Sequence, residues 1–118
     1  MKLIGSVTEA KIREALIYSA CYILNNVGVL TFLEGVFGLI SSSYVLSHTP
    51  EQGEDFYVVL VNGSVVVNFE LSRSCEGAKP ENFVTMEVEQ YRKTLRGRNS
   101  LLKLAIAMEL AAENMQKD

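Results

Sequence analysis

The clearest pattern in the chain is a pair of apolar stretches on either side of Asn62-Gly63, running from Phe56 to Leu71. Asn-Gly accepts the positive φ angles of a type I′ turn, so the pattern predicts a β-hairpin that folds at these two residues. A two-residue turn also fixes which residues pair across the strands. The predicted pairs are Val61 with Ser64, Leu60 with Val65, Val58 with Val67 and Phe56 with Phe69. In this register one face of the hairpin is wholly apolar and is expected to face the core.

The opposite face of the predicted hairpin is mixed in character. It carries Tyr57, Val59, Val61, Ser64, Val66 and Asn68. This face is too apolar for free exposure and too polar for a deep core, which makes it the first candidate for an interface.

The N-terminal part of the chain predicts a long helix. Ser6-Val7-Thr8-Glu9 matches the capping box, and apolar residues follow at helical spacing from about Thr8 to Asn26. The second half of this helix is almost entirely apolar, so we expect it to be buried on more than one side. The segment 29–40 contains two glycines but also a second Ser/Thr-x-x-Glu cap, which favours a short helix over 32–39, with a strand as the alternative.

The middle of the chain predicts β-structure. Tyr44 to His48 reads as a strand and Thr49 to Gly53 as a turn, which together with the hairpin predict a three-stranded antiparallel meander. After a polar stretch over 72–82, apolar residues at 84, 88, 91 and 95 favour a helix that continues to Arg96. Val84, Met86 and Val88 also alternate with polar residues, so a fourth strand is the alternative for this segment.

The last element is predicted to be a helix after Gly97, capped by Asn99 or Ser100. Its apolar residues form two stripes, which predict two packing partners. The first stripe consists of Leu101, Leu104, Ala105, Met108, Ala112 and Met115, and the second of Leu102, Ile106 and Leu110.

Size and composition are those of one folded domain. The chain has 118 residues, of which 48% are hydrophobic and 21% are charged. The elements above therefore predict a single α+β domain over 1–118, with a three-stranded, alternatively four-stranded, antiparallel sheet packed against N-terminal and C-terminal helices. Two distant cysteines, Cys21 and Cys75, predict reduced thiols in a cytoplasmic protein rather than a disulfide framework.

A membrane span is considered because Ala15 to Leu33 contains 19 residues without a charge. Asn25-Asn26, followed by Gly28, lies in the middle of this stretch. Adjacent amides are costly in hydrocarbon, whereas this sequence is typical of the end of a water-soluble helix. We therefore expect no membrane insertion.

No arrangement of catalytic or metal-binding residues stands out. His48 is the only histidine, and no motif places it beside either cysteine. Two cysteines and one histidine fall short of a four-ligand zinc site, and Gly35-Val36-Phe37-Gly38 lacks the third glycine and the lysine of phosphate-binding loops. We expect no metal and no cofactor. A small enzyme that uses His48 with Cys75 or a carboxylate is kept as an alternative.

Charge is unevenly distributed along the chain. The segment 90–107 contains five basic residues and no acidic one, so it carries +5, and the remaining residues carry −8 within a total of −3. The basic residues are Arg92, Lys93, Arg96, Arg98 and Lys103. They are candidates for anion or nucleic-acid contact, with Tyr91 available to stack on a base. A sequence pI of about 5.2 is opposite to the usual charge of nucleic-acid-binding proteins, so we rank this function second.

The leading hypothesis is a cytoplasmic protein-binding module, homodimeric and without catalytic activity. The mixed hairpin face and the doubly striped last helix offer more apolar area than one small core hides, and such area marks interfaces. The predicted partner or dimer contacts are Tyr57, Val59, Val66, Leu102, Ile106 and Leu110. The order of elements resembles that of the type III secretion chaperones, which are dimeric α+β proteins that hold a partner polypeptide. Small bacterial immunity proteins have a similar outline, so the resemblance implies binding of a protein partner.

Overall fold

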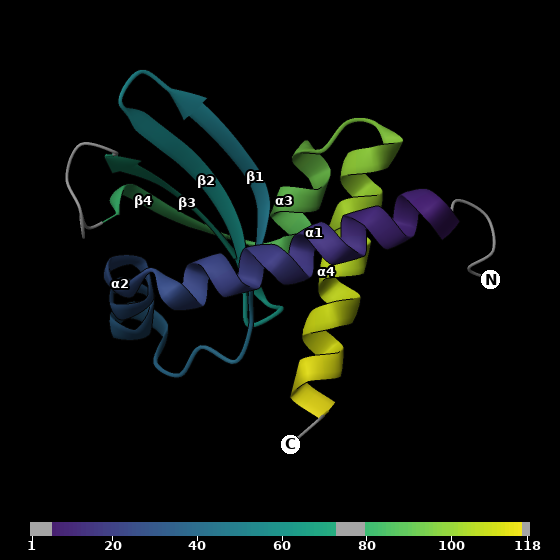
Figure 1. Cartoon of the computed structure of the whole chain (residues 1–118), viewed down its shortest axis with the longest axis horizontal. Helices are drawn as coiled ribbons and strands as arrows, with labels where there is room; N and C mark the ends of the chain where they lie inside the picture. Colours follow the sequence, from purple (N-terminus) through teal and green to yellow (C-terminus); the bar gives the residue numbers. More distant parts are fainter. Residues whose placement is uncertain (1–5, 73–79, 117–118) are drawn as a thin grey trace.

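The computed structural model describes residues 6–72 and 80–116 and confirms the α+β architecture. Its sheet has four antiparallel strands in the order β1-β2-β3-β4, flanked by helices from both ends of the chain (Figure 1). The elements are α1 (Ser6–Asn25), α2 (Val27–Phe37), β1 (Ser43–Glu51), β2 (Glu54–Val61), β3 (Val65–Ser72), β4 (Glu81–Glu87), α3 (Val88–Thr94) and α4 (Arg98–Gln116).

The first two helices are separated by a single residue, Asn26. Its side-chain oxygen accepts a hydrogen bond from the Val29 amide at 3.2 Å and caps α2. The helix prediction for this segment is confirmed and the strand alternative is wrong, although α2 starts at Val27 rather than at residue 32. Among the described residues no single helix is long and apolar enough to cross a membrane, and α1 and α2, which pass that test only as a pair, bend by 89° at the break.

β1 is longer than predicted, because Thr49, Pro50 and Glu51 belong to the strand rather than to a turn. Pro50 is tolerated there because β1 lies at the edge of the sheet, where a missing amide leaves no ladder bond unmade. The chain reverses at Gln52-Gly53, between the paired residues Glu51 and Glu54. A β-bulge at Leu46 interrupts the pairing with β2, because Val45 pairs with Val59 and Ser47 already pairs with Val58.

The β2–β3 hairpin folds at the predicted turn but in a different register. Asn62 and Gly63 have φ angles of 55° and 68°, and the Ser64 amide donates to the Val61 carbonyl at 3.1 Å. Ser64 then stays outside the ladder, and Val61 pairs with Val65. The predicted pairs are therefore wrong by one residue. The observed pairs include Leu60 with Val66, Val59 with Val67, Val58 with Asn68, Tyr57 with Phe69 and Phe56 with Glu70.

The segment that follows the polar loop begins as a strand, so the helix predicted from residue 84 is wrong in its first part. β4 pairs with β3, with Val66 opposite Met86 and Val67 opposite Thr85, and the fourth-strand alternative is confirmed. The helical spacing is realised only from Val88, in α3. Gly97, with a φ angle of 92°, separates α3 from α4. Asn99 and Ser100 lie inside the first turn of α4 and do not precede it as a cap.

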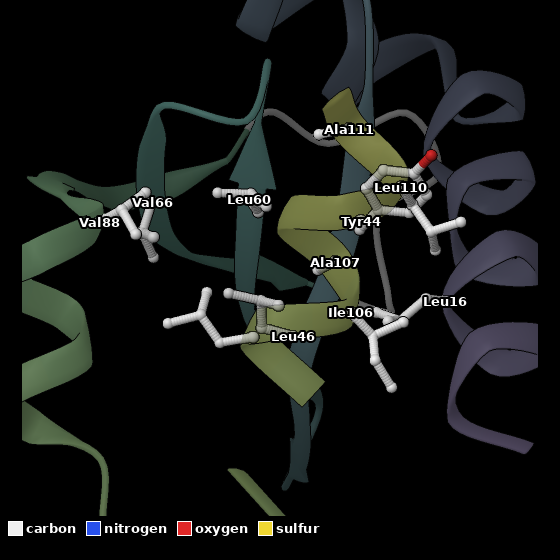
Figure 2. Packing of buried hydrophobic residues seen from close by; sticks show 11 residues of the cluster. Leu16, Tyr44, Leu46, Leu60, Val66, Val88, Ile106, Ala107, Leu110 and Ala111 are labelled. Carbon is white, nitrogen blue, oxygen red and sulfur yellow. The ribbon is translucent and has the colours of Figure 1, made fainter. Parts of the chain in front are cut away.

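Both faces of the sheet are covered, and each has its own hydrophobic cluster. On one face Leu60, Val66 and Tyr44 pack with Leu16 of α1 and with α4, and Figure 2 shows these side chains converging. On the other face Tyr57, Val59, Val61, Val67 and Phe69 pack with Ile23 of α1 and with Val29 and Leu33 of α2. The single apolar face that was predicted is thus divided between two cores, because a one-residue shift exchanges the faces of the partner strand.

α1 contributes to both clusters because it packs along the edge strand β1. The Ser19 hydroxyl accepts a hydrogen bond from the Val45 amide at 3.0 Å and donates one to the Leu16 carbonyl at 2.6 Å. A helix therefore satisfies an amide at the free edge of β1, which protects that edge from pairing with another chain. Arg13 of α1 forms ion pairs with Glu109 and Glu113 of α4.

The buried face of α4 differs from the predicted stripes. Its buried residues are Leu104, Ile106, Ala107, Leu110 and Ala111. Leu101, Ala105 and Ala112 of the first predicted stripe are exposed, so α4 has one buried face, which lies between the two predicted stripes along Ala107 and Ala111. Ala111 lies over the hairpin turn, where a Cβ placed on Gly63 would come within 2.9 Å of the Ala111 Cβ.

Candidate binding surfaces

The residues predicted to contact a partner lie mostly inside the protein. Val59 and Val66 are fully buried, and Tyr57, Ile106 and Leu110 are at most 7% exposed. Leu102 is half-buried and packs against the first cluster. The apolar area that suggested an interface is therefore covered by the chain itself. A partner would have to use other residues.

The outer face of α1 exposes apolar side chains that the sequence had suggested would be buried. Tyr18 is 78% exposed and Ile17 48% exposed, and Cys21 is an exposed free thiol. Tyr22, on the flank of this face, is 41% exposed. We call these four residues the α1 patch. They lie within two turns of one another, since side chains three and four residues apart share a helix face.

Charge on the outer face of α1 is balanced. Among the described residues from Val7 to Asn25, the exposed charged side chains are Lys11 and Glu14. They lie one turn from each other and two turns or less from Tyr18, and their net charge is zero. The chain as a whole carries −3. The α1 patch therefore lies on a neutral surface of an acidic protein.

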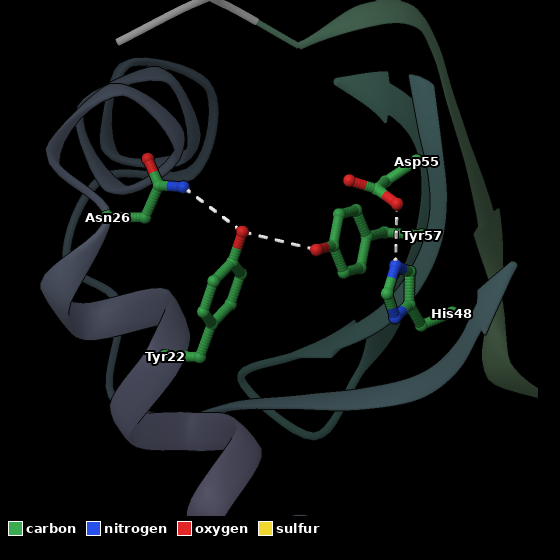
Figure 3. A network of polar contacts seen from close by, with 5 residues as sticks. All are labelled: Tyr22, Asn26, His48, Asp55 and Tyr57. Carbon is green, nitrogen blue, oxygen red and sulfur yellow. Dashed lines mark hydrogen bonds and ion pairs between the residues drawn. The ribbon is translucent and has the colours of Figure 1, made fainter. Parts of the chain in front are cut away.

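Tyr22 also connects α1 to the sheet. Its hydroxyl accepts hydrogen bonds from the Tyr57 hydroxyl at 3.1 Å and from the Asn26 side-chain amide at 3.4 Å (Figure 3). The ring of Tyr57 stacks on His48, with centroids 4.6 Å apart, and His48 Nε2 lies 2.9 Å from Asp55 Oδ1. These contacts give the buried Tyr57 hydroxyl a partner and fix the inner side of Tyr22.

The basic segment is divided among several environments. Arg92 forms an ion pair with Glu89, one turn away in α3. Lys93, Arg96 and Arg98 are exposed. Lys103 differs from them, because it is half-buried in a groove beside α3. The structure thus brings one of the five predicted basic residues into a defined cavity and leaves three on open surface.

The groove lies between β1, α3 and α4 and has a volume of about 220 Å³. Its polar lining consists of Ser47, Tyr91, Ser100 and Lys103, and its apolar lining of Leu46, Leu95 and Leu104. The bulge in β1 creates one wall. Ser47 pairs with Val58 and so faces the same side of the sheet as Val58, while the extra residue Leu46 also packs into the first cluster.

Burial changes the acid–base behaviour of two groups in the groove. Desolvation lowers the pKa of the Lys103 ammonium and raises the pKa of the Tyr91 hydroxyl. No residue that the structure describes forms an ion pair or hydrogen bond with the Lys103 side chain. Desolvation is consequently not offset by a carboxylate, and the groove holds a positive charge without a counter-charge.

A second cavity, of about 330 Å³, is lined by residues of β2, β3 and the start of β4. Phe56, Val58 and Asn68 line it, together with Glu70, whose carboxylate accepts a hydrogen bond from the Asn82 side chain at 2.9 Å. Phe56 and Val58, which were predicted to face the core, are therefore half-buried beside an open cavity. The described residues of its lining include an acidic group and no basic one.

The residues proposed for catalysis are only partly placed. His48 lies beside Asp55, whereas Cys75 falls outside the described residues. Cys21 is exposed on α1, while His48 belongs to β1 and turns toward Tyr57. Within 6–72 and 80–116 no group of three or more His, Cys, Asp or Glu side chains could hold a metal ion.

The sequence reasoning missed Tyr18 and the two groove serines. Tyr18 could have been found, because it shares a helical face with Glu14 and Lys11 rather than with Leu16 and Ile23. Ser47 and Ser100 carry no such local signal, because a bulge and a tertiary contact bring them together. No family model, curated protein or solved structure matches this chain.

Proposed function

We propose that this protein is a cytoplasmic protein-binding module that associates with a second copy of itself through the outer face of α1. The observation that carries the proposal is Tyr18, which is 78% exposed at the centre of the α1 patch. Tyrosine is enriched at the cores of protein interfaces, where a large ring adds contact area at a small entropic cost. An exposed free thiol at Cys21 is consistent with a reducing compartment.

Self-association is favoured over an unrelated partner by the charge of the surface. Two copies that each carry −3 repel one another unless they meet at a neutral region. The outer face of α1 supplies this region, because Lys11 and Glu14, the exposed charges among its described residues, cancel. In a two-fold arrangement the same patch faces itself, and opposite charges on neighbouring turns can then pair between copies.

The expected dimer is weak. α1 has 20 residues and is about 30 Å long, so two such helices bury an area at the lower end of specific interfaces. A dissociation constant on the order of 10 μM, about −7 kcal/mol, is expected for this contact. A weak dimer suits an adaptor, a secretion chaperone or an immunity protein whose partner competes with the second copy.

The test compares Tyr18→Arg with Leu39→Arg by sedimentation velocity at protein concentrations from 1 to 300 μM (about 0.1 to 30 times the expected dissociation constant). Leu39 is 84% exposed but lies outside α1, so it is a matched control. Wild-type protein and Leu39→Arg should form dimers as concentration rises, and Tyr18→Arg should stay monomeric. The proposal is wrong if the wild type is monomeric throughout or if both variants dimerise equally.

The same variants separate protein binding from adsorption to lipid. Sedimentation with anionic and neutral liposomes should recover none of the three proteins. Recovery of the wild type, and its loss with Tyr18→Arg, would mean that the α1 patch contacts a membrane surface and would overturn the proposal.

A further inference from the structure

The groove between β1, α3 and α4 contains the positive charge of Lys103, and partial burial of this charge costs desolvation free energy. Lys103 is on α4, next to Leu104 of the first cluster, and lines a cavity of about 220 Å³. A lysine normally reaches water along its flexible stem. Here about half of the side chain is shielded and no described residue supplies a counter-charge.

Three hydroxyl-bearing residues line the same groove as Lys103. Ser47 comes from the bulged strand β1, Tyr91 from α3 and Ser100 from the first turn of α4. Three separate elements therefore direct hydrogen-bond donors to one cavity. Hydroxyls can donate or accept, but a lysine only donates, so the group that satisfies all four at once is an acceptor with several oxygens.

We propose that this groove binds the phosphate group of a small organic phosphate. A phosphate offers three oxygens that can accept from Lys103 and from the serine and tyrosine hydroxyls, and lysine binds phosphate as a point charge. Among the described residues that line the groove, no acidic side chain would repel it. The described lining of the second cavity instead includes the carboxylate of Glu70 and no lysine or arginine.

Phosphate is favoured over a carboxylate by the field around the groove. The segment 90–107, which supplies five of the seven lining residues, carries +5 and contains no acid. Attraction to such a field grows with the charge of the ligand, and a phosphate monoester carries up to two negative charges at neutral pH. Exposed Arg96 and Arg98 add to this field without entering the cavity.

The size and the apolar walls of the groove limit the rest of the ligand. Cavities that hold drug-sized molecules are about 300 to 1,000 Å³, so 220 Å³ admits a phosphate with one small substituent. Leu46, Leu95 and Leu104 would contact an apolar or aromatic substituent. A terminal phosphate of an oligonucleotide offers the same chemistry, and the experiment distinguishes that source from a free small molecule.

Calorimetric titration of the full chain at low salt with phenyl phosphate, inorganic phosphate and benzoate tests the proposal. Phenyl phosphate should bind more tightly than inorganic phosphate, and benzoate at least tenfold more weakly than phenyl phosphate. Lys103→Met, which keeps the length of the stem, should weaken phenyl phosphate binding at least tenfold. Arg98→Met, which removes an exposed cation of the same segment, should weaken it less than threefold.

A single-stranded oligonucleotide with a 5′ phosphate, and the same strand without it, form the second arm. Dependence on both the terminal phosphate and Lys103 would identify a nucleic-acid end as a ligand of the groove. Equal binding of the two strands, together with binding of phenyl phosphate that depends on Lys103, would support a free small molecule as the ligand. Equal loss of phenyl phosphate binding in Lys103→Met and Arg98→Met would overturn the proposal, because a diffuse basic surface explains that result. Absence of phenyl phosphate binding at 10 mM (about −2.7 kcal/mol) would also overturn it. Far-UV circular dichroism and the thermal midpoint establish that each variant is folded.

Discussion

Asn62 gives the sharpest test of how the hairpin turn is held. Its side-chain oxygen accepts hydrogen bonds from the Ser41 amide at 2.6 Å, the Ser41 hydroxyl at 3.0 Å and the Ser42 amide at 3.3 Å. Its side-chain amide donates to the Leu39 carbonyl at 3.1 Å. The residue also has a positive φ angle of 55°. One side chain therefore joins the β2–β3 turn to the segment between α2 and β1.

Three substitutions separate the hydrogen bonds from the backbone conformation. Asn62→Asp keeps the acceptor and loses only the donor to Leu39, which should cost about 0.5 to 1 kcal/mol of unfolding free energy. Asn62→Gly tolerates the positive φ angle but loses all four contacts; at about 0.5 kcal/mol each for partly solvated bonds, it should cost about 2 kcal/mol. Asn62→Ala adds the strain of a left-handed residue, about 1 kcal/mol more, for a total near 3 kcal/mol.

Urea unfolding followed by circular dichroism measures these differences as shifts in midpoint at an unchanged slope. Asn82 provides the control, because it has a φ angle of 53° but, among the described residues, one side-chain hydrogen bond, to Glu70. Asn82→Gly should cost about 0.5 kcal/mol. If Asn62→Gly costs no more than Asn82→Gly, the four contacts do not stabilise the turn. If Asn62→Ala lowers the unfolding free energy by the same amount as Asn62→Gly, residue 62 does not hold a positive φ angle, and the described geometry of the turn is refuted.

Three further outcomes follow from the burial or exposure of particular side chains. Ile106→Ala should lower the unfolding free energy by about 2 to 5 kcal/mol, measured by urea unfolding, and a neutral effect would place this side chain outside the core. Cys21 should react with a thiol reagent in the native state, and more slowly as protein concentration rises; a rate independent of concentration would contradict pairing through α1. Because burial lowers the pKa of Lys103, the native state loses this proton before the unfolded chain does, so stability should gain a component that rises with pH below 10.5 and is absent in Lys103→Met. Tyr91, whose pKa burial raises, should oppose this gain only above pH 10.0. A rise of stability with pH that is equally large in Lys103→Met would contradict the assignment to Lys103.

Local sequence signals predicted the elements of this fold better than the relations between them. The helices α1, α2 and α4 and the turn at Asn62-Gly63 were each visible in a short window, because caps, periodicity and glycine act within a few residues. The register of the hairpin could not be predicted from such a short window. Val61 pairs with Val65 because one additional loop residue, Ser64, stays outside the ladder while Asn62 binds the segment 39–42 and Gly63 meets Ala111. These contacts come from parts of the chain far from the turn.

The one-residue shift also explains why the predicted interface proved to be core. In the predicted register Val59 and Val66 lie on one face, whereas in the structure they face opposite sides of the sheet and each enters a different cluster. A sheet with two apolar faces needs two layers of helix, which α4 and α2 provide. β4 was misassigned for a related reason. Val84 and Val88 have helical spacing, but β3 needs a partner along its outer edge, and tertiary pairing overrides a weak local preference.

The two proposed sites share a physical origin in this arrangement. Because α2 and α4 cover the two sheet faces, α1 packs against the edge of β1 and its outer side has no neighbour within the described chain, which leaves Tyr18 in solvent. The bulge that turns Leu46 and Ser47 toward α4 opens the groove in which Lys103 is shielded. Neither an exposed tyrosine nor an unpaired, half-buried ammonium stabilises the monomer, and both violate the pattern that the rest of the sequence obeys. Such violations are expected where a surface binds something else, since a second copy would cover Tyr18 and an anion would supply the charge that Lys103 lacks.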